Sequence, residues 1–154
     1  MTDITSHDDI IDVRDITGRV EELRGDLESA HDEEMEAGRT NLDFGDWRDA
    51  VRSDASAAHA NEHWDTDNEL RGLESLLDDI RGYGGDHQWE GDWYPVTLIR
   101  DSYFTEYAMD LLADTGEIPR DIPHYIVIDE EATAANIRTD YSDVEFDGAT
   151  YWYR

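Results

Sequence analysis

The chain has 154 residues, of which 40 are Asp or Glu and 12 are Arg, with no Lys, so its formal net charge at pH 7 is -28. This excess of negative charge argues against binding to nucleic acids or anionic membranes and indicates basic partners. Hydrophobic residues make up 38% of the chain and cysteine is absent, so we expect a folded core, and disulfide or thiol chemistry is excluded.

The N-terminal segment, residues 1 to about 14, lacks the basic and apolar regions of a signal peptide, and no run in the chain approaches the length of a membrane span. The sequence therefore predicts a soluble protein of the cytoplasm, here that of a host cell. Ile10, Ile11 and Val13 are the only apolar anchors in the segment, which is expected to be loosely ordered.

The next segment has apolar residues at Ile16, Val20, Leu23 and Leu27, with Ala30 following. This spacing predicts a helix that packs along one face, and Gly38 is a plausible end for it. The opposite face is expected to be acidic, with Glu21, Glu22, Asp26, Glu28, Glu33, Glu34 and Glu36.

A short helix is predicted around Phe44, Trp47, Ala50 and Val51, with Asp43 or Asp46 near its start. Residues 53 to 61 are rich in Ala, Ser and His and suit either a helix or a linker. Thr66 and Glu69 have the spacing of a capping box and predict the start of another helix. In that helix Leu70, Leu73, Leu77 and Ile80 are expected to face inward and Glu74, Asp78 and Asp79 outward.

After Gly82, Gly84 and Gly85, which end this helix, residues 88 to 94 are expected to form an aromatic and acidic connector. A further helix is predicted from a cap at Ser102 to Gly116, with Pro119 preventing its continuation. Its apolar positions are Tyr103, Phe104, Tyr107, Ala108, Leu111 and Leu112.

The C-terminal part is predicted to contain a short strand at residues 126 to 128 and a helix capped by Asp129. In this helix Ala132, Ala135 and Ile137 should face inward and Glu130, Glu131 and Arg138 outward. Val144 and Phe146 alternate with acids before Asp147-Gly148, a strong signal for a two-residue turn, so a terminal hairpin is expected.

These elements predict an α+β fold, in which an acidic helical N-terminal half is followed by a small α/β module with a C-terminal β-hairpin. We expect the acidic helical region to comprise residues 1–90 and the C-terminal module residues 91–154.

The C-terminal module resembles the ArdA antirestriction proteins over about residues 92–154. The resemblance is carried by the runs Leu98-Ile-Arg-Asp-Ser-Tyr-Phe-Thr-Glu-Tyr-Ala, Leu111-Leu-Ala-Asp-Thr-Gly-Glu-Ile118, Asp140-Tyr-Ser-Asp-Val-Glu-Phe-Asp-Gly148 and Tyr151-Trp-Tyr-Arg154. ArdA proteins are acidic homodimers that imitate DNA and occupy the DNA-binding groove of type I restriction–modification enzymes. The resemblance implies that Asp110, Leu111, Leu112, Ala113, Asp114, Thr115, Gly116, Glu117 and Ile118 match the antirestriction motif. It also implies a possible homodimer formed through the C-terminal part.

Helix geometry gives the acidic residues a possible use. Residues three and four apart lie about 5–6 Å from each other on a helix face, and phosphates recur about every 3.4 Å along the DNA axis. The residues expected to imitate phosphates are Glu21, Glu22, Asp26, Glu33, Asp46, Asp49, Glu74, Asp78, Asp79, Asp101, Glu106, Asp110 and Asp114. Charge alone fits equally well an acidic structural protein adapted to high salt, with 25 Asp, 15 Glu and no Lys; the resemblance favours mimicry.

The alternatives are a DNA mimic directed at a CRISPR effector or another basic DNA-binding protein, and a metal-dependent hydrolase. The latter rests on His59, Glu62 and His63, which fit the His-x-x-Glu-His pattern of one metallopeptidase class. A calcium loop opening at Asp65 lacks its central glycine and its last Glu, so a helix start explains that stretch better. No nucleophile–base arrangement emerges, and we predict a non-enzyme without cofactor or metal.

Overall fold

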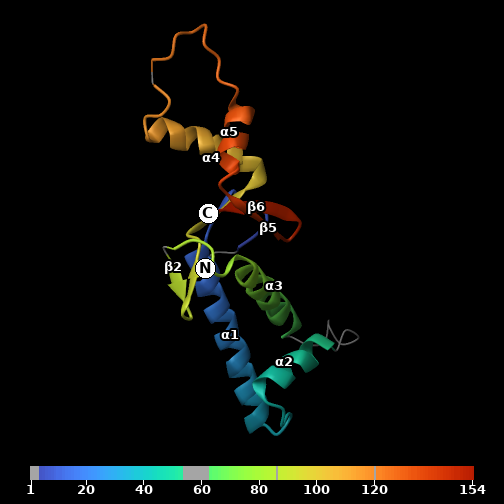
Figure 1. Ribbon diagram of the computed structural model, residues 1–154. Coiled ribbons are helices and arrows are strands. Elements are labelled where there is room, and N and C mark those ends of the chain that lie inside the picture. Colours follow the sequence, from blue (N-terminus) through green and yellow to red (C-terminus); the bar gives the residue numbers. More distant parts are fainter. Residues whose placement is uncertain (1–3, 54–62, 86, 120) are drawn as a thin grey trace. The chain divides into compact units, whose positions relative to one another are not determined.

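The computed structural model describes residues 4–53, 63–85, 87–119 and 121–154, and within them it has an α+β fold with five helices and six strands (Figure 1). The chain forms two compact units. Asp15–Asp78 is the helical unit, and Met1–Arg14 together with Asp79–Arg154 is the sheet unit. This division differs from the predicted boundary at residue 90 in two ways. Strand β1 (Ile10–Asp12) pairs within the sheet unit, and the second part of that unit begins at Asp79.

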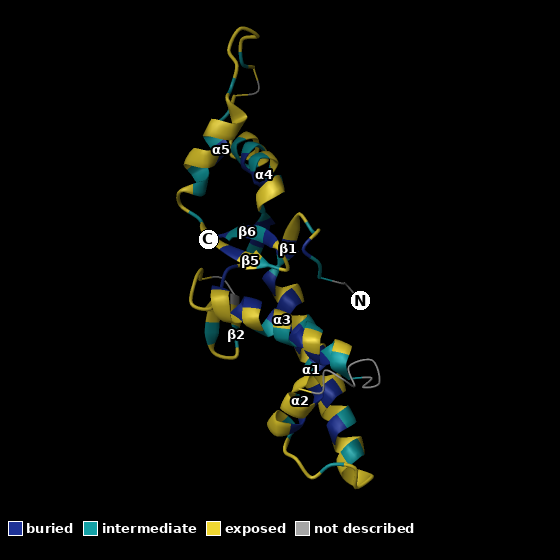
Figure 2. Cartoon of the chain, turned by 90° about the vertical axis from the view of Figure 1, so that its right-hand side faces the viewer, coloured by how far each residue is buried: buried dark blue, intermediate teal, exposed yellow. Residues whose placement is uncertain are grey.

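The helical unit contains most of helix α1 (Val13–Glu36), all of α2 (Phe44–Ser53) and most of α3 (Trp64–Ile80). Each helix turns an apolar face inward, as its 3.6-residue periodicity predicts, and Figure 2 shows buried and exposed residues on different sides of α1. The buried apolar side chains of this unit are Ile16, Val20, Leu23, Leu27, Trp47, Val51, Leu70, Leu73, Leu76 and Leu77.

The ends of these helices confirm some predicted signals and correct another. Gly38 adopts a positive φ of 71° just after α1, which a glycine does at little cost. Asp43 caps α2, since its Oδ1 accepts a hydrogen bond from Asp46 N at 2.8 Å. The prediction that Thr66 and Glu69 form a capping box is wrong, because α3 already begins at Trp64 and both residues lie inside the helix.

The main sheet of the sheet unit has four antiparallel strands in the order β1–β4–β6–β5. The strands are β1 (Ile10–Asp12), β4 (Thr97–Arg100), β6 (Ala149–Tyr153) and β5 (Ser142–Phe146). The tight turn between β5 and β6 has positive φ at both Asp147 (48°) and Gly148 (83°), as a type I′ turn requires. The predicted terminal hairpin is confirmed.

Residues 4–14 of the N-terminal segment are ordered, contrary to the prediction of a loose segment, and residues 1–3 lie outside the described residues. Ile11 is buried, and β1 pairs with β4. The Tyr151 hydroxyl donates a hydrogen bond to Asp8 O at 2.7 Å, and Arg100 Nε donates one to Ser6 O at 2.6 Å. These partners of the N-terminal segment lie more than 80 residues away along the chain. The local sequence therefore did not indicate that the segment would be ordered.

Helix α4 (Asp101–Asp114) packs against strands β4 and β6 of this sheet, and α5 (Glu130–Arg138) packs on α4. Their core consists of Ile99, Phe104, Ala108 and Ala134. Asp129 caps α5 as predicted, accepting from Ala132 N at 3.1 Å.

Three details of these helices were predicted wrongly. Ser102 does not cap α4, which begins at Asp101 after an Arg100 without a side-chain cap bond. Ala134 rather than Ala132 or Ala135 faces the core. Arg138 is half-buried, with its guanidinium carbon 5.3 Å from the ring centroids of both Phe104 and Trp152, an arrangement that favours a cation over aromatic faces.

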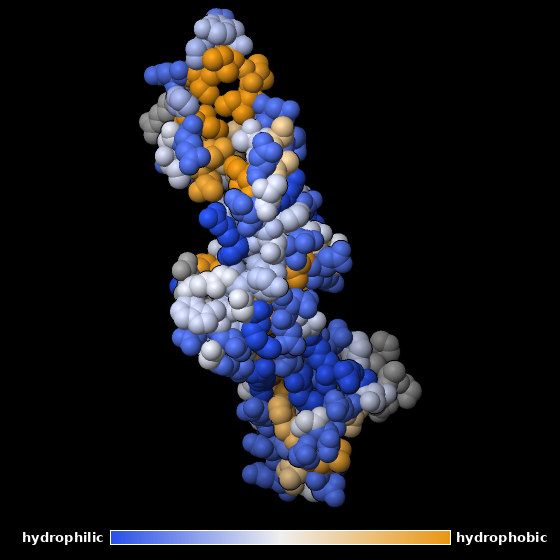
Figure 3. Space-filling model, in the orientation of Figure 1, coloured by the Kyte–Doolittle hydropathy of each residue, from blue (hydrophilic) through white to orange (hydrophobic). Residues whose placement is uncertain are grey.

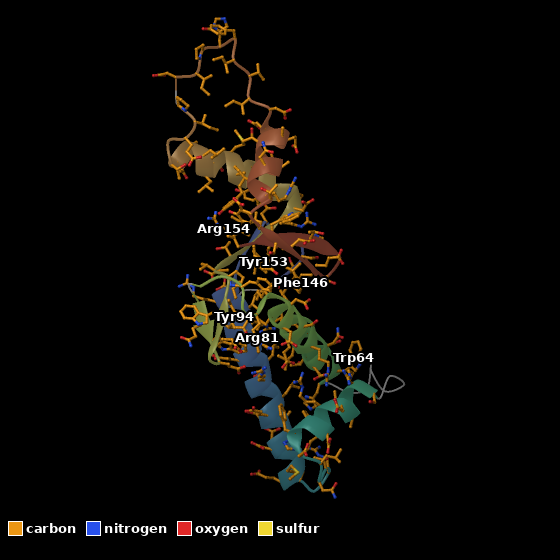
Figure 4. The ribbon with its side chains drawn as sticks, in the orientation of Figure 1. Trp64, Arg81, Tyr94, Phe146, Tyr153 and Arg154 are labelled. Carbon is orange, nitrogen blue, oxygen red and sulfur yellow. The ribbon has the colours of Figure 1, made fainter. Side chains whose placement is uncertain are left out.

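The predicted connector is a second small sheet, the hairpin of β2 (His87–Trp89) and β3 (Asp92–Tyr94). Its turn places Glu90 and Gly91 at positive φ, 52° and 83°. Arg81 Nε donates to the hydroxyl of buried Tyr94 at 3.2 Å; both residues are labelled in Figure 4. Glu-Gly is a weaker turn signal than Asn-Gly or Asp-Gly, which explains why the sequence did not predict a hairpin here.

The strand predicted at residues 126–128 is absent. The segment joins no sheet, and Ile126 and Val127 are 51% and 87% exposed. Both sides of β4 are occupied, by β1 and β6, and residues 126–128 lie in the loop between α4 and α5. In the described part of the chain, no helix combines the length and apolar character needed to cross a bilayer.

Candidate protein-binding surface

The outer face of α1 carries acidic side chains in two rows. One row is Asp15, Glu22, Asp26 and Glu33, and the other is Glu21, Glu28 and Asp32; all of these residues are exposed. Steps of seven and four residues keep each row on one side of the helix, because both are close to whole numbers of turns. From residue 15 to residue 33 an α-helix rises about 27 Å, so the first row extends over most of the helix.

The arginines of the helical unit are used mainly between its helices. Arg19 of α1 binds Glu69 of α3, with Nη2 2.8 Å from Oε2, and Arg24 binds Glu74 of α3 at 3.0 Å. The Arg19 and Arg24 side chains are only 12% and 31% exposed. Both arginines are therefore turned towards α3, and Arg19 Nη1 also lies 3.2 Å from Oε1 of Glu22 in the first row.

A second ion-pair network joins α2 and α3. The carboxylate of Asp67, 2% exposed, is bound by Arg48 Nε at one oxygen and by Arg71 Nε at the other, each at 2.7 Å. Arg48 also binds Glu74 at 3.0 Å, and Arg71 lies 3.3 Å from Asp49. Burial lowers the pKa of Arg48, but its bonds to Glu74 and Asp67 outweigh this effect and raise the pKa above its ordinary value.

The pKa of Arg19 follows the same balance. Burial lowers the pKa, and the bond to Glu69 more than reverses this shift, so the pKa is raised overall. Both arginines therefore remain charged throughout the physiological pH range and hold the carboxylates of α3 in place.

The thirteen acids predicted to imitate phosphates have different environments in the structure. Ion pairs with arginine are formed by residues that include Glu22, Asp49, Glu74 and Asp101. The other nine are exposed: Glu21, Asp26, Glu33, Asp46, Asp78, Asp79, Glu106, Asp110 and Asp114. The outward orientation predicted for Glu74 is wrong, since its half-buried carboxylate joins Arg24 to Arg48.

Glu34 was also expected on the outer face of α1 but lies half-buried. Its Oε2 accepts a hydrogen bond from Trp47 Nε1 of α2 at 2.6 Å, which attaches α2 to α1. Asp15 and Asp32 were missing from the predicted outer face. The same helical spacing that selected Glu22 and Glu33 would have found them.

The segment that resembles the antirestriction motif, Asp110–Ile118, forms the last turn of α4 and its C-terminal cap. Gly116 has a φ of 77°, and the amides of Glu117 and Ile118 donate to Leu112 O at 3.0 and 3.2 Å. Asp110, Asp114 and Glu117 are exposed, whereas Leu111, Leu112 and Ile118 are half-buried. The motif therefore combines exposed acids with partly covered apolar side chains.

The histidines proposed for a hydrolase are only partly described. His59 and Glu62 lie outside the described residues. His63 Nε2 is 4.0 Å from Glu34 Oε1, and the His63 ring lies 5.6 Å from the Trp47 ring. Among the described residues, no three His, Cys, Asp or Glu side chains are placed so as to hold a metal ion.

Comparison of the chain with protein-family models, with curated proteins and with solved structures finds no match in any of the three. The chain's own features define an α+β protein with a strongly acidic helix face and arginines turned inward.

Proposed function

We propose that the chain is a DNA mimic, an antirestriction protein that blocks the DNA-binding groove of a type I restriction–modification enzyme in the host cytoplasm. The observation that carries the proposal is the outer face of α1, where carboxylates recur along about 27 Å of helix while Arg19 and Arg24 are turned towards α3. The resemblance of residues 92–154 to ArdA proteins supports the choice of target.

Such a surface would bind by electrostatic complementarity. A groove that accepts DNA is lined by Lys and Arg, whose attraction for phosphates steers association and releases counterions. Carboxylates held on a folded helix offer the same groove negative charge at fixed spacing, without any covalent step. Binding should therefore weaken steeply as salt is raised.

Competition with DNA tests this function. Labelled duplex DNA is bound to a type I restriction–modification complex, and the chain is titrated in. The chain should displace the DNA, and a variant with Asp15→Asn, Glu22→Gln, Asp26→Asn and Glu33→Gln should need at least about tenfold more protein, because four contacts in the groove are lost.

A matched control variant has the same net charge as the variant with four substitutions on α1. Glu130→Gln, Asp140→Asn, Asp143→Asn and Glu145→Gln remove four exposed carboxylates of the sheet unit. This control should displace DNA nearly as well as the original chain. Equal losses for both variants would show that total charge matters rather than the row on α1.

Failure of the original chain to displace DNA at low salt would reject the antirestriction function. Parallel competition on a DNA-binding CRISPR effector tests the same mimicry at another target. If the chain displaces DNA from neither complex, a protein whose acidic surface serves hydration at high salt is the better interpretation.

A further inference from the structure

In the described part of the sheet unit, the most apolar exposed feature is the loop between α4 and α5, residues 117–119 and 121–129. In Figure 3 hydrophobic residues gather around this loop. Tyr125, Ile126 and Val127 are 75%, 51% and 87% exposed. Since the chain is otherwise rich in charged and polar residues, such a cluster indicates a contact surface.

The loop encloses a hollow of about 290 Å³. Its apolar lining consists of Ile118, Pro119, Ile122, Pro123, Ile126 and Ile128. Two acids, Glu117 and Asp121, also line the hollow, so an apolar lining is combined with negative charge.

Both ends of the loop are held by helices that pack on each other. At the α4 end, Glu117 N donates to Leu112 O at 3.0 Å. At the α5 end, Asp129 accepts from Ala132 N, and within the loop Ile126 N donates to Pro123 O at 2.9 Å. The hollow is therefore part of a turned and anchored segment rather than a free chain end.

Charge decides which occupant fits. Residues 117–131 contain five acids and one arginine. Two copies joined face to face would bring these acids together, because a two-fold interface sets the same patch against itself. A partner that surrounds an apolar side chain with Arg or Lys matches both the apolar and the acidic residues of the lining.

We propose that residues 117–119 and 121–129 form a second protein-binding site, whose hollow receives an apolar side chain flanked by Arg or Lys on a basic partner. The inference rests on the proposed function in that this partner is the same DNA-binding target. Apolar burial depends little on salt, so the site would slow dissociation after the acidic helix has guided association.

The test uses two synthetic peptides of equal charge, Arg-Leu-Arg-Phe-Arg and Arg-Ser-Arg-Ser-Arg, at about 0.5 M NaCl, where screening weakens ionic attraction. The chain should bind the first peptide at least about tenfold more tightly than the second, because only the first offers apolar side chains to bury. The double variant Ile126→Ser, Val127→Ser should lose this preference.

Two further variants separate the site from general effects. Tyr125→Ser, at a 75% exposed position, should reduce the preference without lowering the melting temperature. Met35→Ser changes an apolar side chain on α1 that is 45% exposed, and should retain the preference. Equal binding of both peptides by the original chain would overturn the proposal. A dimer that becomes monomeric in the double variant, measured by sedimentation, would also overturn it, since a second copy would then cover the loop.

DNA displacement measured on the same proteins keeps the two proposals apart. A chain that prefers the apolar peptide but leaves DNA bound supports the loop site and rejects mimicry. A chain that displaces DNA but binds both peptides equally supports mimicry and rejects the loop site.

Discussion

Asp67 shows how a single buried acid organises the helical unit. Its carboxylate is almost inaccessible and is bound by Arg48 and Arg71, one at each oxygen. A buried charge is tolerated only when it is paired and hydrogen-bonded. Here the carboxylate of Asp67 and the guanidinium groups of Arg48 and Arg71 balance one another's charge.

Asp67→Asn should therefore destabilise the chain by about 3 kcal/mol, because two partly buried guanidinium groups lose their shared carboxylate and keep only Glu74 and Asp49 as charged partners. Asp65→Asn, at an exposed position of the same helix, is the control and should change stability by less than about 0.5 kcal/mol. Urea denaturation measures both values. Similar effects for the two variants would mean that Asp67 is not the centre of the network.

Tyr151 plays a comparable part in the sheet unit, where its hydroxyl donates to Asp8 O and lies 3.3 Å from Thr5 O. Burial raises its pKa, as it raises the pKa values of Tyr107 and Tyr153. A group whose pKa is higher in the folded state contributes stability below its unfolded value, near pH 10, and this contribution is lost as pH rises through the folded pKa.

The free energy of unfolding should therefore fall as pH rises above about 10. Tyr151→Phe should cost about 1 kcal/mol at neutral pH through the lost hydrogen bond, and its stability should decline less steeply in alkali. Urea denaturation between neutral pH and about pH 11 provides the measurement. An unchanged slope in the variant would show that Tyr151 does not contribute to the alkaline transition.

At the scale of elements, the same residue type has opposite effects in a turn and in a helix. Gly148 needs a positive φ in the β5–β6 turn, whereas Gly72 lies exposed within α3 with nothing within 4 Å of an added Cβ. A side chain at position 148 would strain the turn. A side chain at position 72 would reduce the conformational freedom of the unfolded chain and so favour the helix.

Gly148→Ala should destabilise the chain by about 1–2 kcal/mol, since the left-handed conformation costs that much for a residue with a Cβ. Gly72→Ala should stabilise it by about 0.5–1 kcal/mol through helix propensity. Thermal denaturation of both variants checks the signs. Loss of stability in Gly72→Ala would reveal a close contact of α3 at that position.

For the whole molecule, a net charge of -28 on 154 residues makes self-repulsion a major cost of folding. The ion pairs of Arg19, Arg24, Arg48 and Arg71 offset part of it between the helices, while the acids on the outer rows of α1 remain exposed. The exposed acids that are proposed to bind a basic groove therefore also destabilise the unbound protein through their mutual repulsion.

The melting temperature should accordingly rise by several degrees when NaCl is increased from about 10 mM to about 150 mM, over which the Debye length falls from about 30 Å to 8 Å. The variant lacking the four carboxylates of the α1 row should start from a higher melting temperature and respond less to salt. Differential scanning calorimetry gives both quantities. Equal responses would show that the row does not dominate the repulsion.

Much of the local structure could be predicted from the sequence because its signals act over a few residues. The spacing of Ile16, Val20, Leu23 and Leu27 predicted the buried face of α1, and Asp147-Gly148 predicted the terminal turn. Asp129 was recognised as a cap for the same reason. The acidic character of the surface follows from composition alone.

Only the tertiary structure decided which distant groups meet. It brings β1 to β4, turns Arg19 and Glu74 inward, and leaves residues 126–128 exposed instead of in a strand. Each of these outcomes depends on a partner far away in the chain, which periodicity and capping patterns do not encode. For the same reason, the sequence determined that the surface would be acidic, and the fold determined which acids are exposed on it.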